Sequence, residues 1–148
     1  MFNFKFLTLH FELEENMSTI FTKIISGEIP SHKISENEEF LAFLDIRPIN
    51  PGHTLVIPKK ETDYIFDMED EALGKLMIYA KKVARAIKKA VPCERVGVMV
   101  AGLEVRHVHI HLVPIFGVGD LNFAKAKPAS PEELKAVAEK IRSALSGP

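Results

Sequence analysis

Three histidines alternate with apolar residues late in the chain, where residues 107–114 read His-Val-His-Ile-His-Leu-Val-Pro. Side chains on a β-strand point alternately to the two faces of a sheet, so this pattern predicts a strand with its apolar side chains in the core. His107, His109 and His111 would then line the opposite face, about 7 Å apart along the strand. Burying three imidazoles without partners would cost free energy, so we expect this face to be polar or open.

Turn and helix signals divide the rest of the chain into short elements. Apolar residues recur at helical spacing between Leu73 and Ile87, with Asp67 or Asp70 as the expected cap and Pro92 as the end. A second helix is expected after the capping box Ser130-Pro-Glu-Glu133. The remaining expectations are one or two helical turns in 19–26, a loop in 117–129, and strands in 31–35, 39–44, 53–57, 96–100 and 107–114.

Strands and helices do not alternate regularly along this chain. That order favours an α+β fold with an antiparallel sheet of about five strands, one long central helix and a C-terminal helix. The length of 148 residues fits one domain that buries its own core.

Charge and cysteine content exclude several classes of protein. The chain has 19 basic and 20 acidic residues, which argues against a partner that is a nucleic acid or a membrane surface. No apolar run approaches the ~20 residues of a transmembrane helix. The single cysteine, Cys93, excludes an internal disulfide framework and any site that needs two thiolates.

The first sixteen residues are treated apart from the domain at 17–148. Phe2, Phe4 and Phe6 alternate as in an edge strand, but Met17 could equally be the natural start, with 1–16 an upstream extension. Polar residues interrupt the apolar stretch and no small-residue cleavage site follows, so a signal peptide is not indicated. We therefore expect a cytoplasmic protein.

The three alternating histidines allow three interpretations. They could be hydrogen-bonded residues that serve only the sheet, or metal ligands with His53 as a further ligand. They could also include a nucleophile, because an imidazole that is largely neutral near pH 7 can attack phosphorus. Neighbouring imidazoles would then stabilise the phosphate charge and supply a proton to the leaving group.

The same residues resemble the signature of the histidine-triad nucleotide-binding proteins, and most closely their bacterial phosphoramidase-like branch. The segments 20–30, 40–46 and 49–59 are also similar to this family, in order, so that the resemblance spans residues 18–122. It implies the HIT-like fold, a homodimer and an AMP-type purine nucleotide as substrate. It also implies hydrolysis or transfer at the α-phosphate of a nucleoside phosphoramidate or anhydride, through a nucleotidyl-histidine and without a cofactor. The alternatives are a dinucleoside-polyphosphate hydrolase and a nucleotide-binding regulatory module with little turnover.

Carried over by position, the resemblance assigns a role to each candidate residue. His109 would be the nucleophile, His107 and His111 would flank it, and His53 would support the triad from behind. Asp45 would accept hydrogen bonds from the ribose. The base slot would be lined by Phe21, Phe43, Ile46 and Leu55, although core packing explains Phe43 and Leu55 equally well. Asn50 would be a polar contact or a turn residue, and backbone amides around Gly102 would face the phosphate.

Two features depart from the family pattern. Many bacterial relatives carry a Cys-x-x-Cys zinc site where this chain has Ser18, Thr19 and Thr22, so we expect no metal there. The segment 101–106 before the triad is shorter than in relatives, and Glu104 stands where a small hydroxyl residue is common. A carboxylate there would repel an anionic substrate unless it turns away or pairs with a cation such as Arg106.

Overall fold

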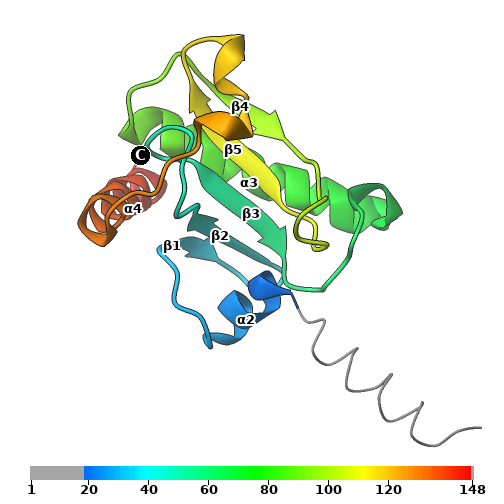
Figure 1. Cartoon of the computed structure of the whole chain (residues 1–148). Coiled ribbons are helices and arrows are strands. Elements are labelled where there is room, and N and C mark those ends of the chain that lie inside the picture. The colour runs from blue at the N-terminus through cyan, green and yellow to red at the C-terminus, as the bar shows by residue number, and fades with distance from the viewer. Residues whose placement is uncertain (1–18, 148) are drawn as a thin grey trace, which may run out of the picture.

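A five-stranded antiparallel sheet forms the centre of the protein. The computed structural model describes residues 19–147, so the expectations for residues 1–16 lie outside it. The strands follow the order β1-β2-β3-β5-β4, and every neighbouring pair is antiparallel (Figure 1). The predicted α+β class and sheet are therefore confirmed. The strand bounds are β1 Lys33–Glu36, β2 Phe40–Leu44, β3 Thr54–Pro58, β4 Arg95–Met99 and β5 Ile110–Ile115.

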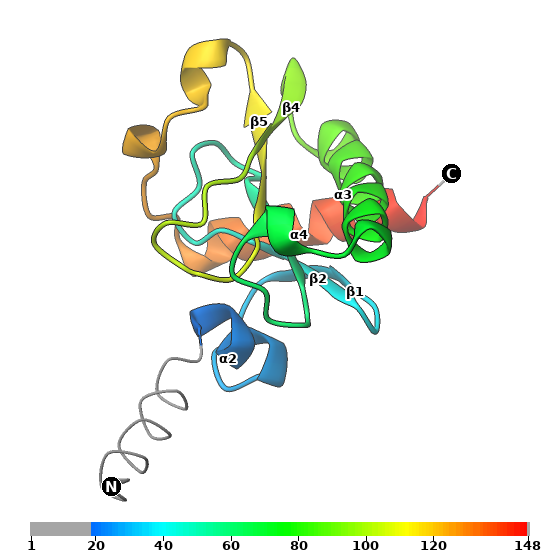
Figure 2. The same cartoon turned by 90° about the vertical axis from the view of Figure 1, so that its right-hand side faces the viewer.

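Two long helices cover one face of this sheet, and a short helix lies against the other. Helix α3 (Asp70–Ala90) and helix α4 (Pro131–Ser146) pack on the first face, whereas α2 (Ile20–Ser26) lies on the second (Figure 2). Both predicted long helices are confirmed, and Ser130 caps α4 by accepting the N–H of Glu133. The expected cap of α3 is wrong, because Glu69 precedes that helix and makes no side-chain capping bond.

Alternation along β2 and β3 separates two apolar clusters. The cluster on the face covered by α3, here called the α3-side core, includes Ala42 and Val56. The cluster on the opposite face, here called the α2-side cluster, consists of Leu41, Phe43, Leu55 and Ile57 together with Phe21 of α2. Each strand therefore contributes to both faces, as a period of two requires. Phe21 of the α2-side cluster lies against the ring of His109.

The strand that carries the histidines begins later than predicted. β5 starts at Ile110, so His107 and His109 precede it. The backbone explains this, because Val108 donates its N–H to the Thr62 carbonyl instead of to a neighbouring strand. Val108 still lies in the α3-side core with Ile110 and Leu112, so the predicted alternation of faces holds.

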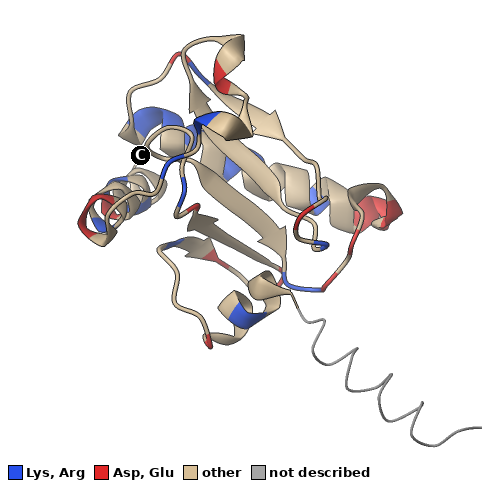
Figure 3. Cartoon of the chain, in the orientation of Figure 1, with Lys and Arg blue, Asp and Glu red and all other residues tan. Residues whose placement is uncertain are grey.

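Charged residues are absent from β2, β3 and β5 and lie instead on the helices, loops and outer strands (Figure 3). The loop predicted in 117–129 contains two single turns of 3-10 helix, Val118–Asp120 and Phe123–Lys125. Within residues 19–147, no helix is long and apolar enough to cross a membrane.

The turn before β3 depends on a glycine, and this gives a first prediction. Gly52 has a φ of 98°, and a Cβ there would lie 2.9 Å from Val91 Cγ2 and 3.2 Å from Pro114 Cγ. We expect Gly52→Ala to lower the free energy of unfolding by about 1–3 kcal/mol, because strain and overpacking add. Urea unfolding measures this change.

The matched control is Gly74→Ala in α3, where an added Cβ meets no atom within 4 Å. That substitution should stabilise the protein by about 0.5–1 kcal/mol through helix propensity. Equal effects of the two substitutions would contradict the role given to Gly52.

Candidate active site

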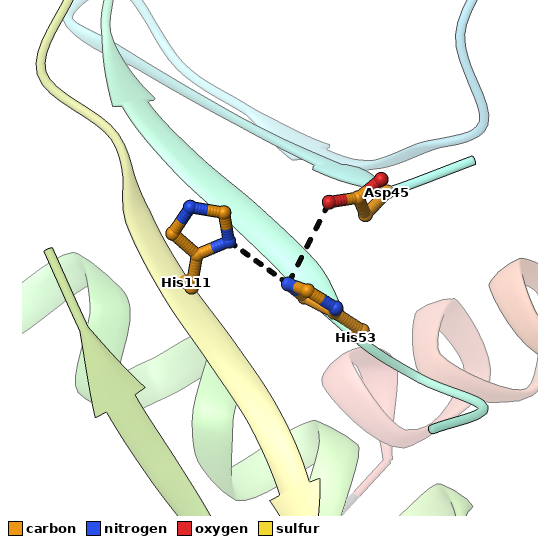
Figure 4. A group of neighbouring side chains, drawn as sticks. All are labelled: Asp45, His53 and His111. Carbon is orange, nitrogen blue, oxygen red and sulfur yellow. Dashed lines mark hydrogen bonds and ion pairs between the residues drawn. The ribbon is translucent and has the colours of Figure 1, made fainter. Parts of the chain in front are cut away.

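Two buried histidines, one just before a strand and one in the neighbouring strand, form a direct hydrogen bond. His53 lies just before β3 and His111 lies in β5, and their Nε2 and Nδ1 atoms are 2.9 Å apart (Figure 4). On its other side, His53 Nδ1 accepts the backbone N–H of Ile49 at 3.0 Å. Asp45 Oδ2 lies 3.7 Å from His53 Nε2. The sheet therefore brings together three of the residues predicted from sequence.

The backbone donor at His53 determines where the protons of this pair reside. A backbone N–H can only donate, so Nδ1 of His53 carries a lone pair and Nε2 of the neutral ring carries the proton. His53 then donates to Nδ1 of His111, which leaves the His111 proton on its own Nε2. Among residues 19–147, no group accepts a hydrogen bond from that N–H. It is a free donor at the edge of the site.

A second backbone contact determines the tautomer of His109. Its Nδ1 lies 2.7 Å from the carbonyl oxygen of His107, which can only accept, so Nδ1 carries the proton. The lone pair of the neutral ring is therefore on Nε2, where the described residues place no partner. His107 is held in turn, because its Nε2 donates to the Pro58 carbonyl at 2.8 Å.

Exposure distinguishes the four histidines. The side chains of His53 and His107 are fully buried, whereas His111 and His109 keep 6% and 8% of their surface exposed. Burial lowers the pKa of His109 and of His53, and a nearby Asp45 carboxylate opposes the shift at both. Burial, together with the adjacent His109 and His53, lowers the pKa of His111 to about 3. These three rings are therefore neutral near pH 7, and His109 is the most accessible.

Asp45, His53 and His111 offer donor atoms within 4.8 Å of one another, a separation that a metal ion could bridge. The proton positions do not fit this use. A metal on His53 Nε2 would displace its proton, and the ring would then need a proton on Nδ1, opposite the Ile49 N–H. Within residues 19–147, the two histidines of this group are instead joined by a hydrogen bond, and the Asp45 carboxylate lies beside it.

Two of the expected polar contacts are already engaged within the protein. Asp45 Oδ1 accepts the N–H of Arg47 at 2.9 Å, which fixes the carboxylate while its other oxygen faces His53. Asn50 donates its side-chain N–H to the Pro114 carbonyl at 2.8 Å, so it ties the turn to β5. Gly102 lies in the loop before His107 with a φ of 76°.

The four residues expected at the base slot differ in accessibility. Phe21, Phe43 and Leu55 are buried together in the α2-side cluster, and Ile46 is 63% exposed. The ring of Phe21 lies 4.9 Å from that of His109, centroid to centroid, and 5.7 Å from that of Phe43. Phe21 therefore joins the apolar cluster to the histidines.

The hydrogen bond to the His107 carbonyl opposes the lowered pKa of His109, and so do the carboxylates of Asp45 and Glu104, which favour its protonated form. Arg106, the cation expected to pair with Glu104, is paired instead with Asp63 at 3.7 Å.

The HIT domain sequence model matches residues 26–118. The chain belongs to the HIT family. Protein hit of Bacillus subtilis is 38% identical over 138 residues, which covers 86% of this chain and 94% of that protein. Adenosine 5'-monophosphoramidase hnt1 of Schizosaccharomyces pombe is 39% identical over 140 residues, covering 87% and 99%. A crystal structure of a Hit-like protein from Bartonella henselae has a TM-score of 0.76 at 36% identity, covering 86% of this chain and 96% of that one. The family predicted from sequence is confirmed.

Sequence reasoning missed two side chains at the site of this HIT protein. Thr19 Oγ1 lies 3.0 Å from Nδ1 of His107, and the ring of Phe123 lies 4.8 Å from that of His111. A threonine just before a helix is a typical N-cap, so the sequence could have indicated Thr19 as a cap. That pattern does not indicate its contact with His107. Phe123 comes from a segment without periodicity, so no pattern could have identified it.

The neutral histidines predict that acid destabilises this HIT protein. The lowered pKa values of His53, His109 and His111 mean that below about pH 6.5 the unfolded chain binds protons that the folded chain excludes. The free energy of unfolding should therefore be highest above that pH and fall as the pH drops. His111 alone accounts for about 2 kcal/mol by about pH 5.

Urea unfolding at a series of pH values between about 7.5 and 5 measures this loss. His111→Asn should flatten the dependence, because it removes the ring whose pKa is lowered to about 3. A stability that does not change over this range would contradict the neutral state of the buried rings.

Proposed function

We propose that this protein is a nucleotide hydrolase that releases an AMP-type nucleotide from a purine nucleoside phosphoramidate. The intermediate in this proposal is a nucleotidyl group on His109. The observation that carries it is the 2.7 Å hydrogen bond from His109 Nδ1–H to the His107 carbonyl, which leaves the lone pair of the neutral ring on Nε2, where no described residue is its partner. The name of the Schizosaccharomyces pombe relative, an adenosine 5'-monophosphoramidase, agrees with this class of reaction.

The proposed reaction has two displacements at phosphorus. His109 Nε2 attacks the α-phosphorus as the bond to the amine nitrogen breaks, and that nitrogen takes the electron pair of the broken bond and one proton from solvent as the amine leaves. Water then attacks the same phosphorus, the bond to Nε2 breaks and returns its electron pair to Nε2, and one proton of that water passes to solvent as the nucleotide departs. In the intermediate the His109 ring bears a positive charge, which strengthens its Nδ1–H bond to the His107 carbonyl.

The other site residues would bind and orient the substrate. The free Nε2–H of His111, held by His53, would donate to a phosphate oxygen. The Asp45 carboxylate would accept hydrogen bonds from the ribose hydroxyls. Ile46, which is exposed, and the edge of Phe21 would contact the base, whereas Phe43 and Leu55 are buried and support that surface from below.

Charge favours the phosphoramidate over a dinucleoside polyphosphate. Three of the histidines are held neutral, and the charges that act on His109 are the carboxylates of Asp45 and Glu104. Because Arg106 pairs with Asp63, it leaves Glu104 without that cation. A leaving group that carries several phosphates would be repelled here, whereas a neutral or cationic amine would not.

The test is turnover by the full chain of an adenosine phosphoramidate and, separately, of diadenosine tetraphosphate, each with and without a chelator. We expect faster cleavage of the phosphoramidate and no loss of rate on chelation. His109→Asn should lower kcat by about a thousandfold or more, because it removes the attacking nitrogen. Rapid quenching of the wild-type reaction should trap one nucleotidyl group on His109, detected by mass.

His32→Asn is the matched control for loss of a histidine and should keep wild-type rates. Near-normal turnover by His109→Asn would overturn the assigned nucleophile, and loss of activity with the chelator would overturn the metal-free reaction. If the protein binds AMP but cleaves neither substrate, it is a regulatory module.

We also propose a homodimer that forms through the outer edge of β4. The two sheet edges differ, because β1 carries charged Lys33 and Glu36 and is contacted by α4. The β4 edge exposes Val98 and the adjacent Val100. An apolar strand edge tends to pair with another strand, and a second copy satisfies it symmetrically.

Val98→Lys should shift the solution mass from dimer to monomer, because a charge at this edge opposes pairing. Analytical ultracentrifugation measures the mass. Ile20→Lys, on the far side of the sheet and of similar exposure, is the control that should remain dimeric. A monomeric wild type would contradict this assignment.

A further inference from the structure

Thr19, the residue before α2, links the start of the domain to the histidine segment. Its hydroxyl oxygen accepts the backbone N–H of Thr22 at 3.2 Å and so caps the helix. The same oxygen lies 3.0 Å from Nδ1 of His107, 88 residues further along the chain. His107 is fully buried, so this contact is shielded from water.

The proton positions give this contact a direction. Nε2 of His107 donates to the Pro58 carbonyl, so Nδ1 of the neutral ring carries the lone pair. Thr19 uses one oxygen lone pair for the Thr22 N–H, and the Thr22 hydroxyl, 3.3 Å away, can donate to the other. The Thr19 hydroxyl hydrogen then points to Nδ1, which has no hydrogen of its own to donate. Both nitrogens of a buried ring are therefore hydrogen-bonded, which a buried polar group requires.

The position of His107 determines the orientation of the His109 ring. The carbonyl oxygen of His107 accepts the Nδ1–H of His109, so a shift of residue 107 would move the group that orients His109. Phe21, two residues after Thr19, places its ring against both imidazoles, at 5.8 Å from His107 and 4.9 Å from His109. Helix α2 therefore holds this segment by one polar and one aromatic contact.

We propose that Thr19 is a positioning residue of this site. Its hydroxyl holds His107 in the tautomer with the proton on Nε2 and, through the His107 carbonyl, holds His109 in the orientation that exposes its Nε2. The kinetic part of this inference rests on the proposed function, whereas the tautomer of His107 does not.

Two substitutions of Thr19 in the full chain separate its hydroxyl from its size. Nitrogen NMR of the histidine rings should show one protonated and one unprotonated nitrogen for His107 in the wild type and in Thr19→Ser. In Thr19→Val the His107 signals should shift or broaden, because Nδ1 loses its donor. We expect kcat for the adenosine phosphoramidate to fall about tenfold in Thr19→Val, with KM within about twofold, and to stay within about twofold in Thr19→Ser.

A third variant separates the hydrogen bond from the helix cap. Thr19→Asp keeps an oxygen that caps α2, but a carboxylate cannot donate to Nδ1. Nδ1 of His107 then loses its hydrogen-bond donor, so the His107 signals should change from those of the wild type, and kcat should fall as in Thr19→Val. Ser26→Ala is the control for α2, because it removes a side-chain hydrogen bond at the other end of the helix, away from His107.

Specific outcomes would overturn the proposal. An unchanged His107 spectrum in Thr19→Val would exclude the hydrogen bond as the cause of the tautomer. An equal fall in kcat in Thr19→Ser would assign the effect to the methyl group of Thr19, and an equal fall in Ser26→Ala would assign it to helix stability. If the wild type turns over no nucleotide, the proposed function fails, and the His107 spectra alone then decide the role of Thr19.

Discussion

The hydrogen bond from the Ile49 backbone to His53 Nδ1 determines the proton positions along one side of the site. Because this backbone N–H donates to Nδ1, the proton of neutral His53 is on Nε2. His53 then donates to Nδ1 of His111 across 2.9 Å, so the proton of His111 is also on its Nε2. The turn that holds Ile49 is itself tied to β5 by the contact between Asn50 and the Pro114 carbonyl. A backbone group, fixed by the fold, therefore selects the state of a side chain two contacts away.

The sheet makes this arrangement possible by separating its two faces. Helices α3 and α4 cover one face with a continuous apolar core, so the other face does not have to supply the bulk of the stability. On that second face, the small cluster around Phe43 and Leu55 supports Phe21, which contacts the histidines. Apolar packing and hydrogen bonds to backbone carbonyls thus position the same rings from different directions.

The sequence predicted the parts that follow from local patterns. Alternation in 107–114 indicated which face the histidines occupy, and the capping box at Ser130 located the start of α4. The start of β5 was predicted too early, because the Val108 N–H is taken by Thr62, a partner that no local pattern reveals. The same holds for Thr19 and Phe123, whose contacts with His107 and His111 depend on how distant segments fold together.

The neutral state of the histidines has a consequence for how the site responds to its surroundings. Dissolved salt screens the interaction between net charges, and it acts far less on hydrogen bonds from uncharged N–H groups. Because His111 offers a neutral donor that His53 aligns, a contact of this N–H with an anionic ligand, as in the proposed function, would be directional and short-ranged. Recognition of that kind depends on the fit of the ligand within the site, and only weakly on the ionic strength of the solution.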